Sequence, residues 1–469
     1  MPIFKSINIL TYSMRFTFFL LFILTTVFVK AEISLPNIFS DQMVLQRETD
    51  VVLYGWASPN EEFTIYTSWN DTTIEMKTGN NAKWHLEVQT PKAGGPYTII
   101  FKGNDNEIIL NDVLIGEVWL CSGQSNMEWS ANSKIDNKEL EIANADHPNI
   151  RLFTVEKRSA EYPLEDVTGT WKTCSTETMP DFSAVAYFFA KKVQKELNIP
   201  IGLIDSSWGA SCAEVWTPES VFKEHPELVT AHELVEPNNW VTIEKSTLYN
   251  AMIAPLTNFK IAGVLWYQGE SNTANAITYQ QLFTSMITSW RKKWNDEFPF
   301  YYVQIAPFKY GKPYEGGVLR DQQRRTLALN NTGMAMTSDI CTVEDIHPQN
   351  KQDVGLRLAN IALKQHYNVL EQEVYGPLFD SAKIIGNEIH IEFTHDKGLN
   401  SKGEKIDLFE ISNSEGEWFA AKVKLKDGVV LVSSKEVKNP KAVRYAWKST
   451  DISNLKNEVG LPASTFRSE

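Results

Sequence analysis

Short runs of apolar, β-branched and aromatic residues dominate the chain between residues 32 and 110, and each run has the length of a β-strand. Polar clusters rich in glycine, proline and asparagine separate the runs and predict turns. The runs cover residues 51–56, 63–66, 84–88 and 97–101. Strands of this length and spacing are typical of a β-sandwich, so we predict an N-terminal β domain over residues 32–110.

From residue 111 to residue 370 the pattern changes to strands that alternate with helices. Val185, Phe189, Val193 and Leu197 recur every four residues and predict a helix with one buried face. Apolar strands at 113–120, 201–204, 261–267, 300–305 and 334–337 alternate with this helix, with amphipathic helices at 279–290 and 319–329, and with one after Pro348. The alternation predicts a three-layer α/β domain with a mainly parallel sheet.

Alternating apolar and polar positions return after residue 371, at 389–393, 408–411 and 429–432. They predict a C-terminal β region over residues 371–469. The predicted fold class is therefore α/β, with β-sandwich-like regions on both sides of the α/β domain.

Residues 1–31 have the pattern of a signal peptide. Arg15 precedes an uninterrupted apolar run over 16–29, and small residues stand at positions −3 and −1 relative to a cleavage site after Ala31. The run is shorter than the roughly 20 residues of a membrane span. We predict cleavage near Ala31 and a secreted or periplasmic protein. An uncleaved membrane anchor is the alternative, and the chain could start at Met1 or at Met14.

Composition excludes several classes of protein. The 43% hydrophobic fraction is that of a globular chain, and the formal net charge of −13 disfavours a nucleic-acid-binding protein. The sequence contains no H-E-x-x-H or C-x-x-C metal motif and no glycine-rich phosphate loop, so we predict neither a metal nor another cofactor. We expect no membrane partner after signal removal. The oligomeric state and the pairing of Cys121, Cys174, Cys212 and Cys341 stay open.

Unusual polar residues follow three of the predicted parallel strands. Residues 123–127 (GQSNM), 206–209 (SSWG) and 268–272 (QGESN) occupy these loops, and residues 344–347 (EDIH) precede the last helix. Ligands in α/β sheets bind beyond the carboxyl ends of the strands. A serine, a histidine with neighbouring acids, and glycine or amide donors are the groups that acyl transfer requires.

The motif around Ser125 is not the G-x-S-x-G nucleophile elbow, because Met127 stands where the second glycine belongs. It resembles the SGNH hydrolases, and more closely the sialate O-acetylesterase family. The matching blocks span nearly the whole mature chain: GEVWLCSGQSNMEW at 116–129, DSSWGASCAEVWT at 205–217, LWYQGESN at 265–272, DIHPQNKQDVGLRL at 345–358, and RYAWKS to GLPASTFR within 444–467.

The resemblance implies Ser125 as the nucleophile and His347 as the general base. It also implies an oxyanion hole made by the N–H groups of Ser125 and Gly209, with the side-chain amide of Gln268 or Asn272 as a third donor. The sequence does not decide between the two amides. Ala210 stands where the family more often has a second glycine.

Two acids are candidates for the group that orients His347. SGNH hydrolases commonly place an aspartate three residues before the histidine, a position that Glu344 occupies here. Because Pro348 disfavours a helical conformation for His347, the segment is expected to be extended. In an extended segment residues i and i+2 share a face, which favours Asp345. A backbone carbonyl as the partner of His347 is a third possibility.

Two residues are candidates for substrate binding. Trp216 could stack on a sugar ring, in a platform with Trp208 and Trp266, and the planar guanidinium of Arg320 suits a substrate carboxylate. The competing explanation for the tryptophans is packing in the core, and that for Arg320 is a position on a solvated helix face. We expect Glu270 to be a structural hydrogen-bond acceptor rather than a catalytic group.

The predicted function is an exported carbohydrate esterase that hydrolyses O-acetyl esters, first of all those of sialic acids, through a Ser-His(-Asp) acyl-enzyme mechanism. Its partner is an O-acetylated sugar or glycan. The alternative substrate is acetylxylan or another plant polysaccharide. A non-enzymatic alternative is an inactive sugar-binding β protein, which the joint presence of Ser125, Gly209, Gln268 and His347 disfavours.

Overall fold

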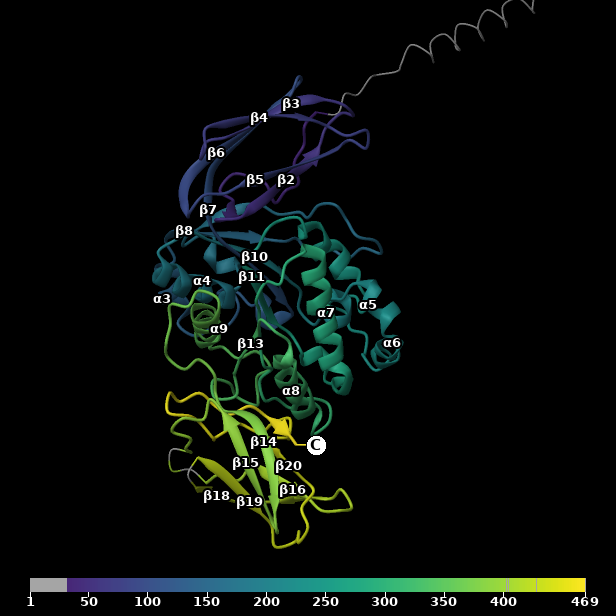
Figure 1. Cartoon of the computed structure of the whole chain (residues 1–469), viewed down its shortest axis with the longest axis vertical. Coiled ribbons are helices and arrows are strands. Elements are labelled where there is room, and N and C mark those ends of the chain that lie inside the picture. Colours follow the sequence, from purple (N-terminus) through teal and green to yellow (C-terminus); the bar gives the residue numbers. More distant parts are fainter. Residues whose placement is uncertain (1–31, 402, 404, 427, 469) are drawn as a thin grey trace, which may run out of the picture.

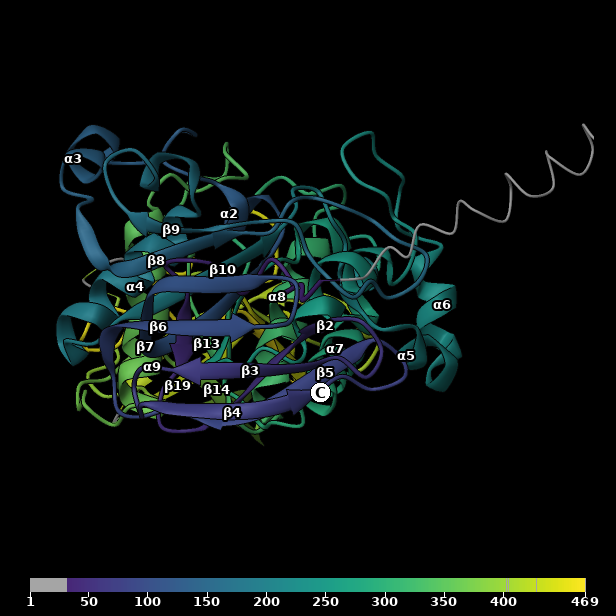
Figure 2. The same cartoon turned by 90° about the horizontal axis from the view of Figure 1, so that it is seen from above.

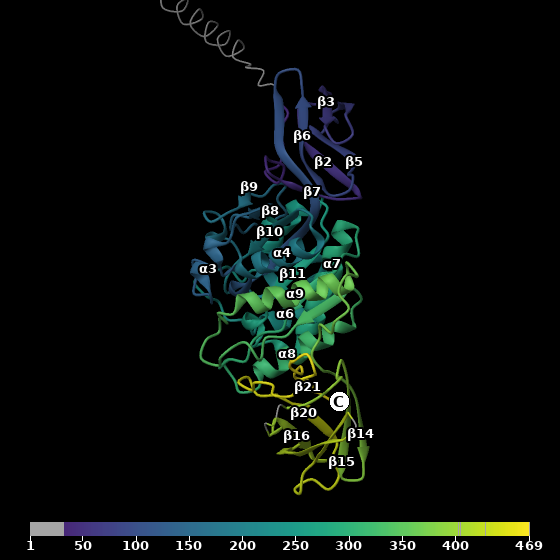
Figure 3. The ribbon, with the colours of Figure 1, turned by 90° about the vertical axis from the view of Figure 1, so that its left-hand side faces the viewer.

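The computed structural model describes residues 32–401, 403, 405–426 and 428–468. The predicted signal peptide and its cleavage site at Ala31 lie outside the described residues. The described chain forms three tiers along its longest axis, with a β region at each end and a tier of helices and strands between them (Figures 1 and 3).

The N-terminal tier is all β. Its strands are β1 (Val44–Gln46), β2 (Asp50–Trp56), β3 (Glu62–Thr67), β4 (Thr72–Lys77), β5 (Lys83–Gln89) and β6 (Gly94–Lys102). Strands β4, β3 and β6 form an antiparallel sheet, while β2 and β5 pair separately. Seen from above in Figure 2, these strands cover one end of the molecule. Side chains of Leu53, Phe63, Trp84 and Phe101 fill the space between them.

Strand β7 (Glu107–Gly123) belongs to both the first and the second tier. Its first half pairs with β6, and Leu114–Gly116 pair with β1. Its second half is a central strand of the next sheet, between β10 (Ile201–Ser207) and β11 (Gly263–Tyr267). The strand therefore continues across residues 110 and 111, where the sequence places a domain boundary.

The middle tier is a mixed α/β fold around a mostly parallel sheet. The remaining strands are β8 (His147–Thr154), β9 (Trp171–Cys174), β12 (Phe300–Val303) and β13 (Thr332–Ala335). The strand order is β13-β12-β11-β7-β10-β8-β9, and β9 alone runs antiparallel to its neighbour. The α/β class predicted from the alternation of strands and helices is confirmed.

Helices cover both faces of this sheet. Trp119 and Cys121 on β7 pack with α4 (Ala184–Leu197) and α9 (Lys351–Gln365), whereas Val118 and Leu120 pack with α7 (Tyr279–Trp294). Successive residues of a strand point to opposite faces, so a continuous apolar strand is expected where both faces are buried. The shorter helices are α2 (Ser125–Glu128), α3 (Lys138–Ala143), α5 (Glu219–Glu224), α6 (Pro226–His232) and α8 (Glu315–Arg325).

The C-terminal tier consists of two four-stranded sheets that enclose one apolar core. One sheet contains β14 (Leu378–Ile385), β15 (Glu388–Thr394), β19 (Val429–Ser433) and β18 (Lys422–Lys426); the other contains β17 (Trp418–Ala420), β16 (Phe409–Ser412), β20 (Ala442–Tyr445) and β21 (Phe466–Arg467). Ile391 and Val432 from the first sheet meet Phe409 and Tyr445 from the second.

The last residues return to the α/β tier. Tyr445, Trp447 and Phe466 are buried, and a Cβ on Gly317 of α8 would lie 1.8 Å from the carbonyl oxygen of Trp447. Within the described residues no helix is long and apolar enough to cross a membrane. All four cysteines are free.

Candidate active site

Ser125 is the first residue of α2, directly beyond the carboxyl end of β7. The turn into α2 needs glycine at position 123, because its φ is +136° and a Cβ there would lie 2.3 Å from the carbonyl oxygen of Tyr267. The Gln124 side-chain oxygen accepts hydrogen bonds from the backbone N–H groups of Gly269 and Ser271. The segment around Ser125 is thereby attached to the loop after β11.

His347 lies against Ser125. Its Nε2 is 2.9 Å from the Ser125 Oγ, and its ring stacks on Trp129 at a centroid distance of 4.4 Å and an interplanar angle of 16°. Burial lowers the pKa of His347, and the positive charge of Lys351 lowers it further against the opposing effect of Asp345. The imidazole is therefore neutral at neutral pH, which is the form that accepts a proton.

Asp345 contacts the backbone of His347. One carboxylate oxygen accepts a hydrogen bond from the His347 backbone N–H at 2.9 Å, and the other faces Gln349 Nε2 at 3.4 Å. Within the described residues, no hydrogen bond joins this carboxylate to Nδ1 of His347. Glu344 is exposed and has no hydrogen bond or ion pair with the described residues. Of the two acids considered, Asp345 lies nearer to the histidine's own atoms.

A buried polar network connects three of the sequence blocks behind Ser125 and His347. The Asn126 Nδ2 donates to Glu270 Oε1 at 2.6 Å and to the carbonyl oxygen of Ile346 at 3.0 Å. The Asn126 Oδ1 accepts a hydrogen bond from the Lys351 ammonium at 2.5 Å. Because Ile346 precedes His347, this network holds the segment of His347 relative to that of Ser125.

Lys351 was not identified from the sequence, although it lies in the histidine block. It is 1% exposed, and burial lowers its pKa to about 7. Its ammonium group lies 5.4 Å from the ring centroid of Trp129 and 5.5 Å from that of Tyr267. A lysine at the first position of a helix opposes the helix dipole. That unfavourable placement was the available signal that the residue serves a purpose other than helix formation.

Gly209 lies beside Ser125, but its N–H group already has an acceptor. A Cβ on Gly209 would lie 3.4 Å from the Ser125 Cβ, so the loop after β10 directly adjoins Ser125. The Gly209 N–H donates to the Glu128 carboxylate at 2.6 Å, and the other oxygen of that carboxylate accepts from Lys157 at 2.6 Å. Glu128 is a second residue of the site that the sequence analysis did not single out.

Ala210 has the backbone conformation that a glycine prefers. Its φ is +62°, in the left-handed region, where a Cβ costs about 1–2 kcal/mol. The glycine that the family more often has at this position would adopt this conformation without that cost. The alanine therefore preserves the shape of the loop at the expense of local strain.

Neither amide proposed as a third oxyanion donor is available to Ser125 in this structure. Gln268 Nε2 donates to the Ser211 carbonyl oxygen at 3.1 Å and to Asn272 Oδ1 at 2.7 Å. Asn272 Nδ2 donates to Glu214 and to Asn275. Each amide has only two N–H donors, and both are used. The two side chains are completely buried and connect the loops after β10 and β11 to each other.

The two predicted substrate-binding residues are structural, and this prediction is corrected. Trp216 is completely buried, donates to Ser211 Oγ and packs edge-on against Trp266. Arg320 is 1% exposed and donates to Thr465 Oγ1 and to three backbone carbonyl oxygens of the C-terminal segment. The apolar ring of tryptophan and the five donors of arginine suit the protein interior as well as they suit a substrate. Sequence alone could therefore not distinguish a structural role from substrate binding.

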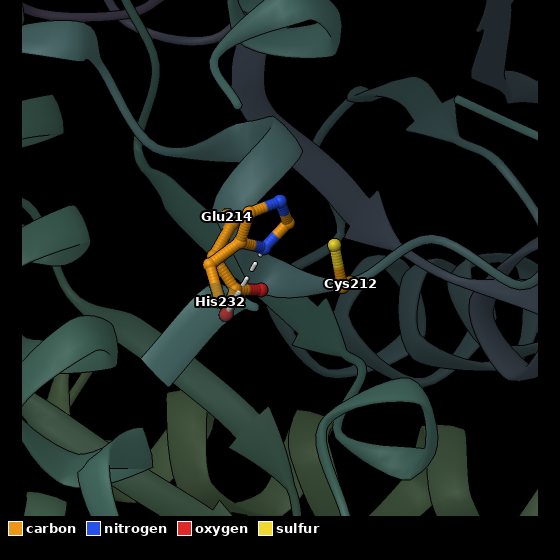
Figure 4. A group of neighbouring side chains, drawn as sticks. All are labelled: Cys212, Glu214 and His232. Carbon is orange, nitrogen blue, oxygen red and sulfur yellow. Dashed lines mark ion pairs between the residues drawn. The ribbon is translucent and has the colours of Figure 1, made fainter. Parts of the chain in front are cut away.

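Cys212 and Glu214, on the segment that follows β10, lie close to His232 at the end of α6 (Figure 4). Their ligand atoms lie within 4.8 Å of one another, and this set of donors is compatible with zinc. The two Glu214 oxygens already accept hydrogen bonds from the Asn272 and Asn275 amides, and His232 Nδ1 is 3.8 Å from one of them. These contacts outweigh burial and lower the pKa of Glu214. The carboxylate thus has a structural role as the acceptor at the centre of this network.

Comparisons with known proteins agree with the sequence blocks. The family model for "Carbohydrate esterase, sialic acid-specific acetylesterase" matches residues 115–364. Sialate O-acetylesterase of Mus musculus is 30% identical, with 86% of this chain and 87% of the mouse protein covered. The human enzyme is 29% identical, with 87% of this chain and 86% of the human protein covered.

Among solved structures, a carbohydrate acetylesterase from Xanthomonas citri is 33% identical and superposes with a TM-score of 0.86. The match covers 93% of this chain and 99% of the bacterial one. The family match, the curated relatives and this structural likeness all extend over the blocks that surround Ser125 and His347. The chain belongs to the sialic acid-specific acetylesterase family of carbohydrate esterases.

Proposed function

We propose that this protein is an exported carbohydrate O-acetylesterase of the SGNH type, with Ser125 as the nucleophile and His347 as the general base. The observation that carries the proposal is the 2.9 Å contact between Ser125 Oγ and Nε2 of a histidine that burial keeps neutral. This contact is of the length that proton transfer from nucleophile to base requires.

The reaction has two steps. Ser125 Oγ attacks the acetyl carbonyl carbon while Nε2 of His347 takes the hydroxyl proton, and the sugar oxygen then leaves with that proton. This leaves an acetyl group on Ser125. Water attacks the acetyl-enzyme with His347 again as the base, and acetate leaves as Ser125 recovers its proton.

The N–H groups of Ser125 and Gly209 stabilise the oxyanion in this proposal. Ser125 is the first residue of α2, so its N–H has no acceptor within the helix. The Gly209 N–H becomes available once the Glu128 carboxylate moves away from it. The Asn126, Glu270 and Lys351 network keeps His347 in place, and Asp345 orients the histidine segment through the backbone.

Sialic acids are the first substrates to test, because the curated relatives are sialate O-acetylesterases. A neutral acetylated plant polysaccharide such as acetylxylan is the second candidate. The Glu128 carboxylate beside Ser125 and the commitment of Arg320 to the C-terminal segment disfavour an anionic substrate. The net charge of −13 also disfavours the binding of an anionic substrate.

The test is hydrolysis of p-nitrophenyl acetate, O-acetylated sialosides and acetylated xylo-oligosaccharides by the purified protein and by Ser125→Ala. We expect the substitution to lower kcat by about 10⁴- to 10⁶-fold while the circular dichroism spectrum is unchanged. EDTA should leave the rate of the wild-type protein unaltered. A Ser125→Ala protein with more than about a tenth of the wild-type rate, or a rate that requires added zinc, would contradict the mechanism.

A further inference from the structure

Trp240 is the only tryptophan in the described part of the chain that is exposed, and 78% of its surface is accessible. The other thirteen are buried or half-buried. Single exposed apolar residues are ordinary on a protein surface, so exposure alone indicates nothing. The position of Trp240 and the way its loop is held distinguish it from such residues.

The loop around Trp240 is held in one conformation. The side-chain oxygen of Asn238 accepts hydrogen bonds from the backbone N–H groups of Trp240 and Val241 at 2.9 and 3.1 Å. Val241 is buried and anchors the loop in the core. Because of these contacts, the exposed indole is carried by a turn of defined conformation.

Two further hydrogen bonds attach this loop to the residues beside the nucleophile. Trp208 Nε1 donates to the carbonyl oxygen of Trp240 at 3.1 Å, and Asn238 Nδ2 donates to the carbonyl oxygen of Ala210 at 3.3 Å. The loop that carries Trp240 is therefore joined by hydrogen bonds to residues 208–210, and Gly209 of that segment adjoins Ser125.

The surroundings of Trp208 contain groups suited to a sugar. The ammonium group of Lys157 lies 5.9 Å from the centroid of the Trp208 ring and is paired with Glu128, which in turn contacts Gly209. Trp208 itself is half-buried. An aromatic face presents an apolar surface for the C–H side of a pyranose, and charged side chains bind its hydroxyl groups.

We propose that Trp240, with Trp208 beside it, forms a stacking subsite for a sugar ring adjacent to the acetylated one. This inference rests on the proposed esterase function and extends it: the substrate is an acetylated sugar within a glycan chain rather than a free acetylated monosaccharide. The subsite binds the substrate without contacting the reacting ester.

The experiment compares wild type and Trp240→Ala on three kinds of substrate: p-nitrophenyl acetate, an acetylated monosaccharide glycoside, and acetylated xylo-oligosaccharides or O-acetylated sialyl-lactose. We expect KM for the longer glycan to rise about tenfold with kcat unchanged. The rates on p-nitrophenyl acetate and the monosaccharide should stay within about twofold of wild type, which also shows that the variant is folded.

Two control variants separate stacking from other effects. Trp240→Phe keeps an aromatic face and should restore most of the affinity for the longer glycan. Ile385→Ala removes an exposed apolar side chain from β14 in the C-terminal tier and should change nothing. Unchanged glycan kinetics in Trp240→Ala would overturn the inference, and so would a parallel loss of activity on p-nitrophenyl acetate.

A binding measurement separates this inference from the proposed function. Titration calorimetry of the Ser125→Ala protein with the acetylated oligosaccharides reports affinity without turnover, and Trp240→Ala in that background should weaken it about tenfold. A wild-type protein that hydrolyses p-nitrophenyl acetate but neither cleaves nor binds the glycans would overturn the subsite alone. Absence of ester hydrolysis together with Trp240-dependent binding would overturn only the esterase proposal.

Discussion

Glu128 lies three residues after Ser125, the proposed nucleophile. Its carboxylate accepts a hydrogen bond from the Gly209 backbone N–H at 2.6 Å. A negative charge therefore occupies the donor that would stabilise the oxyanion. Lys157 holds the other oxygen of the same carboxylate. A hydrogen bond to an ionised group contributes about 1.5–3 kcal/mol, so in the proposed mechanism the displacement of Glu128 from Gly209 adds to the barrier.

Glu128→Gln should raise kcat/KM for p-nitrophenyl acetate about 3- to 10-fold at neutral pH. The neutral amide is a weaker acceptor for the Gly209 N–H and does not repel the developing oxyanion. Glu156→Gln, which changes the exposed acid directly before Lys157 in the sequence, is the matched control and should leave the rate unchanged. A fall in activity for Glu128→Gln would mean that Gly209 does not serve as an oxyanion donor.

Asp345→Asn should lower kcat by about 10- to 100-fold, whereas Glu344→Gln should change it by less than about threefold. Asp345 bonds to the backbone of His347 and raises the pKa of its ring, while Glu344 is exposed and without such contacts. Loss of the negative charge should also move the acidic limb of the kcat/KM profile to lower pH. Equal effects of the two substitutions would show that Asp345 influences His347 no more than Glu344 does.

Lys351→Met should move the acidic limb of the kcat/KM profile to higher pH. Burial is the main cause of the lowered pKa of His347, but the Lys351 charge adds to it. Below pH 7 Lys351 is mostly protonated, so its removal favours the protonated histidine and the base is lost at a higher pH. Asp345 and Glu270, which also face this pair, are unchanged in the variant.

The same substitution should lower kcat about 10- to 100-fold, because Asn126 loses a partner that helps it to hold the histidine segment. Lys195→Met removes an exposed lysine from α4 and is the control for net charge. A variant with a reduced kcat but an unshifted pH profile would show that Lys351 acts only through packing.

Arg320→Lys should destabilise the protein by about 2–4 kcal/mol without changing KM for p-nitrophenyl acetate. Lysine cannot reproduce the fork of donors that reaches Ala446, Lys448 and Ser449, so buried carbonyl groups lose their partners. Urea denaturation measures the change, with the exposed Arg158→Lys as control. A raised KM with unaltered stability would restore Arg320 as a substrate-binding residue.

The order of the elements was predictable because burial leaves a periodic pattern in the chain. The helix predicted from Val185, Phe189, Val193 and Leu197 is α4, and the apolar stretch at 113–120 lies within β7. Val185, Phe189 and Val193 are buried and Leu197 is half-buried, and every residue of β7 from 113 to 120 is buried. The continuation of β7 into the N-terminal tier left no such mark, because its pairing with β6 and β1 is made by backbone hydrogen bonds, which nearly every residue type can form.

The residues of the candidate site divide likewise into those that the sequence motifs identified and those whose partners only the fold reveals. By themselves, the sequence motifs determined the family, the fold class and the pair Ser125 and His347 as candidates, because these depend on residue types that recur at fixed places. Only the tertiary structure decided the partners of the remaining side chains. Gln268, Asn272, Trp216 and Arg320 carry groups that suit a substrate and an interior equally. Each has a hydrogen-bond partner on a segment far away in the chain. The contacts that Lys351 and Glu128 make arise likewise when separate strands end at one edge of the sheet, so no local pattern records them.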